Sequence, residues 1–185
     1  MGTWIVLGVL VALGLYVVYL YNTLVRQRQM VREGWSGIDV QLKRRTDLIP
    51  NLIETVKGYA AHERATLEEV TELRARAASM PRDDVAGRSQ AESMLSQALG
   101  RLFAVAEAYP DLKANDGFRD LQAALDKTED ALQMSRRYYN GAVRQLNTQV
   151  ESFPANLVAE RFGFDVEPYF EIEDPADRSV PQVSF

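Results

Sequence analysis

The stretch WIVLGVLVALGLYVVYLY, which runs from Trp4 to Tyr21, contains no charged or strongly polar side chain. At ~1.5 Å per residue, a helix of this length covers nearly all of the hydrocarbon thickness of a bilayer, and flanking residues complete the span. A tryptophan at one end and three tyrosines near the other suit the aromatic belts of membrane interfaces. The sequence therefore predicts that residues 1–22 form a transmembrane anchor.

A cleaved signal peptide is the alternative interpretation of this stretch. A signal peptide would have a basic region before the apolar run, a shorter apolar run and a small-residue cleavage site. Here no Lys or Arg precedes the run, and the residues that follow it read YNTLV. These features favour an anchor that stays attached to the rest of the chain.

The distribution of basic residues around the anchor predicts its orientation. Arg26, Arg28 and Arg32 follow the apolar run directly, and no basic side chain precedes it. Because flanking Lys and Arg residues stay on the cytoplasmic side, the N-terminus is expected outside and the C-terminal domain in the cytoplasm. We predict a single-pass protein of the cell membrane, or of an organelle membrane derived from it.

Beyond the anchor, apolar residues recur at alternating steps of three and four, which is the spacing of one helical face. Asp83 or Asp84 is suited to cap the third helix, and Pro154 ends the fourth. We predict an all-α fold in which the transmembrane helix is followed by an elongated antiparallel four-helix bundle over residues 23–164. The four apolar stripes cover residues 24–42, 49–77, 95–109 and 118–153.

The end of the chain has a different composition. ANLVAERFGF, after Pro154, predicts a short C-terminal helix that ends at Gly163. Residues 165–185 contain six acidic side chains and one arginine, which is typical of a solvated tail. Since this tail also contains Tyr169, Phe170, Ile172, Val180, Val183 and Phe185, we expect it to dock partly on the bundle.

Two long blocks of the sequence resemble the LemA family. They are YNTLVRQRQMVREGWSGIDVQLKRRTDLIPNLIETVKGYAAHE, from Tyr21 to Glu63, and YYNGAVRQLNTQVESFPANLVAERFGF, from Tyr138 to Phe164. The ending VPQVSF is similar as well, whereas residues 75–115 match only in character. The chain departs from the family pattern at Thr46, Gly37 and Leu146, where a histidine, an amide and an aromatic residue are expected.

The resemblance implies an N-terminal anchor, an N-out orientation and an elongated helical bundle. It implies little chemistry, because the family has no established enzymatic activity. Its members are associated with membrane-stress proteolysis and with envelope or organelle-membrane biogenesis, including a magnetosome-linked branch. The histidine that is replaced by Thr46 weakens any idea of a metal or proton-transfer site at that position.

The residue inventory argues against catalysis and against a cofactor. The 185 residues include no cysteine, which excludes disulfides, thiolate nucleophiles and Cys-ligated zinc. His62 and Glu63 begin like the HExxH zinc motif, but Thr66 stands where the second histidine belongs. A net charge of −5 disfavours nucleic acid as a partner. We expect no enzyme, metal, cofactor or small-molecule substrate.

The stretch VQLKRRTDLIPNLIE, from Val40 to Glu54, combines three cations with a proline. If the anchor and the first helix are continuous, Arg45 lies ~36 Å beyond the anchor, much further than the ~8 Å over which charges act in cells. We favour a corner in which one helix ends after Arg45 and Asp47 caps the next, with Pro50 in its first turn. One continuous, proline-kinked helix is the alternative.

The corner would send the second helix back from Leu48 toward the membrane, which it would reach near residue 72 at ~1.5 Å per residue. Basic residues would then gather at the membrane end of the bundle, where each contributes ~1 kcal/mol near anionic lipid. The alternative is that these arginines pair with neighbouring acids. The candidate membrane-facing residues are Arg26, Arg28, Arg32, Arg74, Arg76, Arg82, Arg88 and Arg144.

We predict a membrane-anchored scaffold or interaction protein, with a regulatory adaptor for a membrane-stress protease as the alternative. The expected partners are the bilayer and other membrane proteins, and the small residues Gly8 and Ala12 leave homo-oligomerisation through the span open. The candidate interaction surface comprises Asp39, Lys43, Arg44, Arg45, Asn51, Glu54, Tyr138, Asn140 and Phe185. Residues expected in the core instead are Trp35, Ile38, Ile53, Tyr139, Phe153, Phe162 and Phe164.

Overall fold

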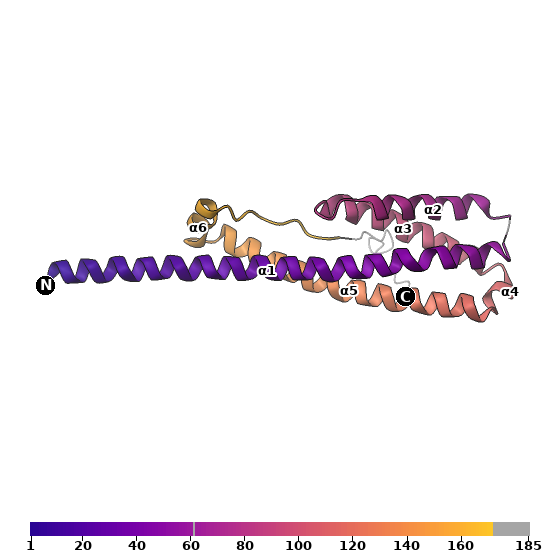
Figure 1. The fold of residues 1–185 in the computed structure, drawn as a ribbon, viewed down its shortest axis with the longest axis horizontal. Coiled ribbons are helices and arrows are strands. Elements are labelled where there is room, and N and C mark those ends of the chain that lie inside the picture. The colour runs from indigo at the N-terminus through magenta and orange to yellow at the C-terminus, as the bar shows by residue number, and fades with distance from the viewer. Residues whose placement is uncertain (61, 172–185) are drawn as a thin grey trace, which may run out of the picture. The chain divides into compact units, whose positions relative to one another are not determined.

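The computed structural model of the chain describes residues 1–60 and 62–171, and this part contains helices and no β-strand. The helices are α1 (Gly2–Lys57), α2 (Arg64–Ser79), α3 (Val85–Ala106), α4 (Pro110–Lys113), α5 (Asp116–Glu151) and α6 (Ala155–Phe162) (Figure 1). The predicted all-α fold is confirmed. The chain divides into two compact units. The first unit is Met1–Ser36 with Ser135–Tyr169, and the second is Gly37–Met134 with the chain from Phe170 onward.

The N-terminal part of α1 is an exposed apolar helix. Its most apolar 18 residues have a mean hydropathy of 2.3, and only 6% of them are buried within the protein. By length and composition this helix can cross a membrane. Leu20 and Leu24 are the first two residues of α1 that are buried. The apolar segment therefore continues, within one helix, into the packed part of the first unit.

The predicted corner at residues 43–54 is wrong, because α1 continues through Pro50 to Lys57. Lys43 does not end a helix but forms an i,i+4 ion pair of 3.1 Å with Asp47. Pro50 has no N–H to donate to the carbonyl of Thr46, one turn earlier. Nε of Arg74 in α2 donates to this carbonyl oxygen at 2.9 Å. A side chain from another helix thus replaces the bond that the proline removes.

In the first unit, α1 and α5 approach each other closely at a glycine. Gly34 is buried, and a Cβ atom built on it would lie 2.9 Å from the Cα of Tyr139 in α5. The rings of Trp35 and Tyr139 lie 5.4 Å apart, centre to centre, on the same contact. Val31 of α1 and Leu146 of α5 are also buried. A small residue at position 34 therefore sets the distance between the two helices.

The chain after α6 lies along the first unit. As predicted, α6 ends at Gly163, which has the left-handed φ of 67° that glycine adopts without strain. Asn147 of α5 donates through Nδ2 to the carbonyl of Glu167 at 2.9 Å and accepts from the Glu167 N–H at 2.8 Å. The Tyr139 hydroxyl donates to the carbonyl of Pro168 at 2.8 Å. Burial, with the charge of Glu167 adding to it, raises the pKa of Tyr139 to about 12.

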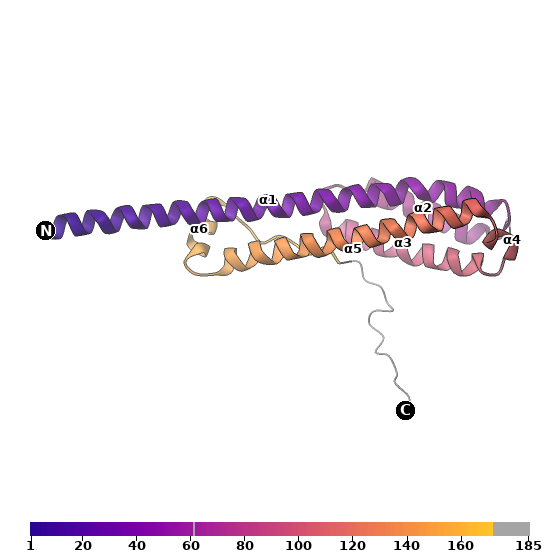
Figure 2. The same cartoon turned by 90° about the horizontal axis from the view of Figure 1, so that it is seen from below.

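In the second unit, four helical segments share one core: the end of α1, α2, α3 and the beginning of α5 (Figure 2). The predicted cap is confirmed, since the Asp84 side chain accepts a 2.8 Å bond from the Gly87 N–H at the start of α3. The one-turn helix α4 was not expected. Buried apolar residues of the core include Ile49, Leu52, Val56, Leu67, Val70, Leu95, Leu99, Leu102, Phe118 and Leu125.

The tail predicted to dock begins within the described residues and continues beyond them. Phe170 is fully buried, and the carbonyl of Glu171 accepts a hydrogen bond from the Ser89 hydroxyl of α3. Both contacts belong to the second unit. Residues 172–185, including the candidate residue Phe185, lie outside the described residues.

The expected core residues separate into two groups. Ile38, Ile53, Tyr139 and Phe164 are buried, and Trp35 is half-buried. The prediction is wrong for two phenylalanines, because Phe153 is 80% exposed and Phe162 is 53% exposed. Apolar character alone placed them in the core, whereas the structure leaves them on the surface around α6.

Candidate functional site

The candidate interaction residues are divided between the two units. In the second unit, Lys43, Arg44, Asn51 and Glu54 are exposed along α1. In the first unit, Tyr138 is exposed and its hydroxyl donates to the Glu33 carboxylate at 3.2 Å. Burial and the neighbouring Glu33 raise the pKa of the Tyr138 phenol. Asn140, beside it in α5, is half-buried.

Arg45 is the exception among these residues, because its predicted place on the surface is wrong. Its side chain is 6% exposed, and Nη2 donates to the hydroxyl of Ser96 in α3 at 2.6 Å. Its Nη1 lies 3.6 Å from an oxygen of Glu92 and 3.6 Å from an oxygen of Glu129. Arg45 is therefore the buried centre of an ion cluster that joins α1, α3 and α5.

Glu92 is the most deeply buried acid of this ion cluster, with 2% of its side chain exposed. Burial raises the pKa of its carboxyl group, although the charges of Arg45 and Arg88 oppose the shift. Among the described residues, Arg45 Nη1 and Glu92 Oε2 have no hydrogen-bond partner. A buried ion pair at 3.6 Å without such bonds recovers little of the cost of desolvating its charges. The cluster is a structural contact of the core and not an open site.

Asp39 connects α1 to the start of α3. Its carboxylate accepts a 2.7 Å bond from Nη1 of Arg88 and lies 3.6 Å from Nη2 of Arg82. Three-quarters of the Asp39 side chain is buried. Because the Asp39 carboxylate already pairs with arginines inside the second unit, it is less available to bind another protein than an exposed aspartate would be.

The arginines of the predicted membrane-facing end are also divided between the units. Arg26, Arg28, Arg32 and Arg144 belong to the first unit, and Arg74, Arg76, Arg82 and Arg88 to the second. The predicted return of a helix from Leu48 is wrong, since α2 begins only at Arg64. Arg74 donates a hydrogen bond to the Thr46 carbonyl, and Arg82 and Arg88 both form ion pairs with Asp39. Arg76 lies at 3.9 Å from the sulfur of Met94.

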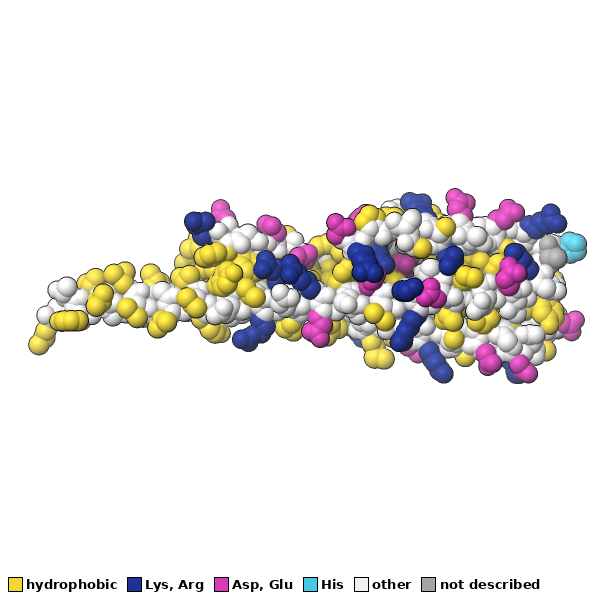
Figure 3. All heavy atoms as spheres, in the orientation of Figure 1, with side chains coloured by type: hydrophobic (Ala, Val, Ile, Leu, Met, Phe, Trp, Pro, Cys, Tyr) yellow, Lys and Arg dark blue, Asp and Glu magenta, His cyan; other side chains and the backbone are white. Residues whose placement is uncertain are grey.

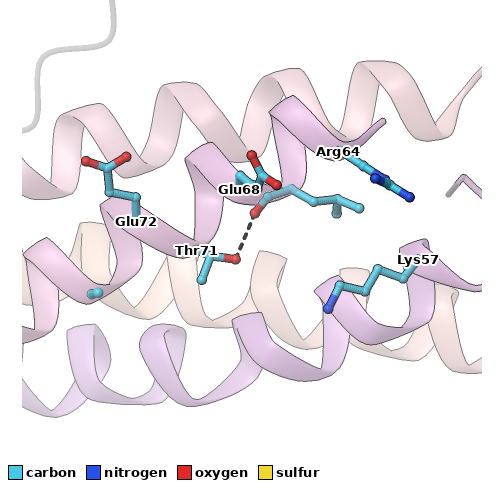
Figure 4. A pocket seen from close by; sticks show the side chains of 7 residues that line it. Lys57, Arg64, Glu68, Thr71 and Glu72 are labelled. Atoms are coloured by element: carbon cyan, nitrogen blue, oxygen red, sulfur yellow. Dashed lines mark hydrogen bonds between the residues drawn. The ribbon is translucent and has the colours of Figure 1, made fainter. Parts of the chain in front are cut away.

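An open groove lies where the end of α1 passes α2 (Figure 4). Its charged side chains are of both signs, and Figure 4 shows Glu72 and Lys57 toward opposite ends of it. The hydroxyl of Thr71 donates to the Leu67 carbonyl in its own helix at 2.8 Å, and Lys57 pairs with Glu54 at 2.9 Å. The lining residues are Lys57, Arg64, Leu67, Glu68, Thr71, Glu72 and Ala75. They include no histidine and no arrangement of a nucleophile with a base.

The only histidine of the sequence, His62, is exposed in the connection between α1 and α2. In residues 1–60 and 62–171, no three His, Asp or Glu side chains are placed to hold a metal ion. The clusters that the described chain does form consist of structural ion pairs, such as Arg45 with Glu92 and Asp39 with Arg88. Both of these pairs join α1 to α3 within the second unit.

Comparison with known proteins identifies relatives that are 23–26% identical to this chain. Magnetosome protein MamQ 2 of Paramagnetospirillum magneticum is 26% identical over 185 aligned residues, which cover 86% of this chain and 68% of that protein. Protein LemA of Metamycoplasma hominis is 26% identical, over 76% of this chain and 64% of its own. Magnetosome protein MamQ of Magnetospirillum gryphiswaldense is 23% identical, over 88% and 70%. The LemA family profile matches residues 34–185. The chain therefore belongs to the LemA family.

Proposed function

We propose that this chain is a single-pass, membrane-anchored scaffold that holds a helical interaction surface at the cytoplasmic face of its membrane and performs no catalysis of its own. The observation that carries this proposal is the continuity of α1 in the first unit. Exposed apolar residues up to Tyr19 are followed, within the same helix, by buried Leu20 and Leu24. No linker separates the segment that fits a bilayer from the segment that packs against α5.

The charges of the first unit support a cytoplasmic location for it. The first unit contains seven arginines and five acidic residues, although the chain as a whole has a net charge of −5. Arg26 and Arg32 are exposed just beyond the apolar segment, and Arg144 is exposed on α5. Basic groups beside a span stay on the cytoplasmic side, and each contributes ~1 kcal/mol near anionic lipid.

The exposed side of α1 in the second unit is the surface that we propose for partner binding. Lys43, Arg44, Asn51 and Glu54 are exposed on it, while Ile49 and Leu52 face the core. Two relatives carry the name magnetosome protein, which is consistent with a role in building or organising a membrane. A protein partner in the same membrane is the class of ligand that such a surface fits.

The orientation is tested with single cysteines, since the natural sequence has none. Thr3→Cys and Ser152→Cys are compared in intact cells with a thiol reagent that cannot cross the membrane. We expect labelling at position 3 and protection at position 152 until the cells are broken. The reverse pattern would refute a cytoplasmic C-terminal part.

The scaffold role is tested by purifying the full chain in mild detergent and identifying what is recovered with it. We expect a homo-oligomer or a complex with membrane proteins, and a loss of the partner when Lys43 and Arg44 are changed to Glu. Lys127→Glu, an exposed change on α5, serves as the control that retains the partner. A monomer with no stoichiometric partner would refute the proposal, and a protease in fixed ratio would favour the adaptor role instead.

A further inference from the structure

The surface around α6 exposes large apolar side chains to an unusual degree. Phe153 is 80% exposed, Leu157 58% and Phe162 53%, all within ten residues of the chain. The side of α6 opposite Leu157 is already used, because Val158 and Ala159 are buried in the first unit. Single exposed apolar residues are common on protein surfaces, but a concentration of this kind marks a contact surface.

The position of α6 along α1 indicates what this surface contacts. The ring of Phe162 lies 5.0 Å from the ring of Tyr21, and that of Phe164 lies 5.8 Å from it. Tyr21 is the last residue of the uncharged stretch, and Arg26 is the first charged residue of α1. The guanidinium of Arg28 lies 4.5 Å above the Phe164 ring. Thus α6 is fixed at the level where apolar surface gives way to charge.

The views of the fold agree with this placement. In both Figure 1 and Figure 2, α6 and the turn that precedes it are the parts of the first unit, other than α1, that lie furthest toward the N-terminal end of α1. Figure 3 shows yellow apolar side chains that continue from the N-terminal part of α1 onto the region of α6. The apolar surface of α6 is therefore continuous with that of the candidate span.

We infer that α6 is a second membrane contact, in which Phe153, Leu157 and Phe162 enter the interfacial zone of the leaflet from which α1 emerges. This inference rests on the proposed anchoring of α1. Helices that lie in the interface bury their apolar side chains ~5–10 Å below the headgroup boundary. The occupant is lipid, because Phe162 contacts Tyr21 at the end of the exposed span and apolar side chains continue from the span onto the region of α6 (Figure 3).

The charges around α6 suit this role. Arg161 is exposed within the helix beside the exposed Glu160, and Arg26 is exposed on α1 five residues beyond Tyr21, which contacts Phe162. Both lie where the headgroups of anionic lipids would be, at the level at which Tyr21 contacts Phe162. An apolar surface with basic residues at its margin is the pattern of an interfacial helix.

The experiment uses the full-length chain in vesicles of phosphatidylcholine and phosphatidylglycerol. Single cysteines carry a nitroxide, whose collisions with oxygen, which is enriched in lipid, and with a water-soluble nickel reagent are compared by electron paramagnetic resonance. Leu157→Cys is the test, Leu13→Cys in the apolar segment is the lipid reference, and Gln145→Cys, exposed on α5, is the water reference. Phe153→Cys repeats the test outside the helix.

We expect the ratio of oxygen to nickel collisions at positions 157 and 153 to be several-fold higher than at position 145 and to approach that at position 13. A water-like ratio at 157 and 153, with a lipid-like ratio at 13, would overturn this inference and leave the anchor intact. A water-like ratio at 13 would overturn the anchoring itself. Low collision rates with both reagents at 157 would mean that protein covers α6, which also overturns the inference.

Discussion

A methyl group on Gly34 would lie 2.9 Å from the Cα of Tyr139, closer than non-bonded carbon atoms approach in proteins. It would also lie 3.1 Å from Cδ1 of Tyr138. Since the nearest neighbour is backbone, α1 and α5 would have to separate in a Gly34→Ala variant. We expect it to lose about 1–3 kcal/mol of unfolding free energy, as overpacked cores do. Denaturant unfolding followed by circular dichroism in detergent measures the loss.

Gly141 provides the matched control, because it lies in α5 of the same unit and a Cβ atom there would meet nothing within 4 Å. Gly141→Ala should raise the stability by about 1 kcal/mol, the difference in helix propensity between the two residues. Equal effects of the two substitutions would contradict the close approach at Gly34.

The hydrogen bond from Arg74 to the Thr46 carbonyl predicts that the stability lost on changing Arg74 depends on whether residue 50 is proline. Arg74→Met should cost about 1–3 kcal/mol, because it leaves the carbonyl freed by Pro50 without a donor. In a Pro50→Ala background the N–H of residue 50 can bond to Thr46, so the same change should cost much less. A double-mutant cycle by chemical denaturation measures this coupling.

Arg76→Met is the control for that cycle, since Arg76 is exposed on the same helix and its guanidinium lies 3.9 Å from the Met94 sulfur. Its cost should be a few tenths of a kcal/mol in both backgrounds, as for other surface changes. If Arg74→Met cost the same with and without Pro50, the compensation would be refuted.

Glu92 predicts a pH dependence of stability with a defined sign. Burial raises the folded-state pKa of this carboxyl above its ordinary value of 4.5, so the folded protein retains the proton to a higher pH than the unfolded chain. Glu92 therefore favours folding most below pH 4.5, and this contribution falls as the pH rises through the folded pKa. Relative to Glu92→Gln, the natural protein should lose stability over this range.

Unfolding free energies of both proteins, measured at several pH values between 4 and 7, test this expectation. The difference between the two unfolding free energies cancels the contribution of the titratable groups that both proteins contain. A natural protein that gained stability relative to Glu92→Gln as the pH rose would show that attraction to Arg45 outweighs burial, contrary to the raised pKa.

The two bonds between Asn147 and Glu167 predict local protection of the segment after α6. Asn147→Ala removes both bonds and leaves the Glu167 N–H without its acceptor, at a cost of about 1–3 kcal/mol. Hydrogen exchange of residues 165–169, read by mass spectrometry, should accelerate strongly. Gln145→Ala, an exposed neighbour in α5, should leave it unchanged. Unaltered exchange in Asn147→Ala would mean that other contacts hold the segment.

The spacing of apolar residues predicted most of the helices, because each helix has one buried side. It failed where a distant residue decides the local structure. Pro50 looks like a helix start when only its neighbours are considered, since the compensating donor, Arg74, belongs to another helix. Family resemblance and periodicity together therefore predicted the fold class but not the length of α1.

The predicted sites failed for a related reason, because residue type was given more weight than position. Arg45 falls three residues after Leu42 and four before Ile49, on the buried stripe of α1, and this spacing could have identified it as buried. The sequence around its acidic partner Glu92 does not by itself predict that Glu92 is buried. Apolar character predicts a core position for Phe153 and Phe162, but both are exposed, and Phe162 lies against Tyr21 at the end of the span.

The hydrogen bond that the Thr46 carbonyl accepts from Arg74 can form only late in the synthesis of the chain. Its donor, Arg74, is translated only after α1 is complete, so newly synthesised α1 leaves the ribosome with one backbone acceptor unpaired. Until α2 folds back against it, water must fill that place and the helix is free to bend at Pro50. The last turns of α1 are thus completed by a helix that does not yet exist when they are synthesised.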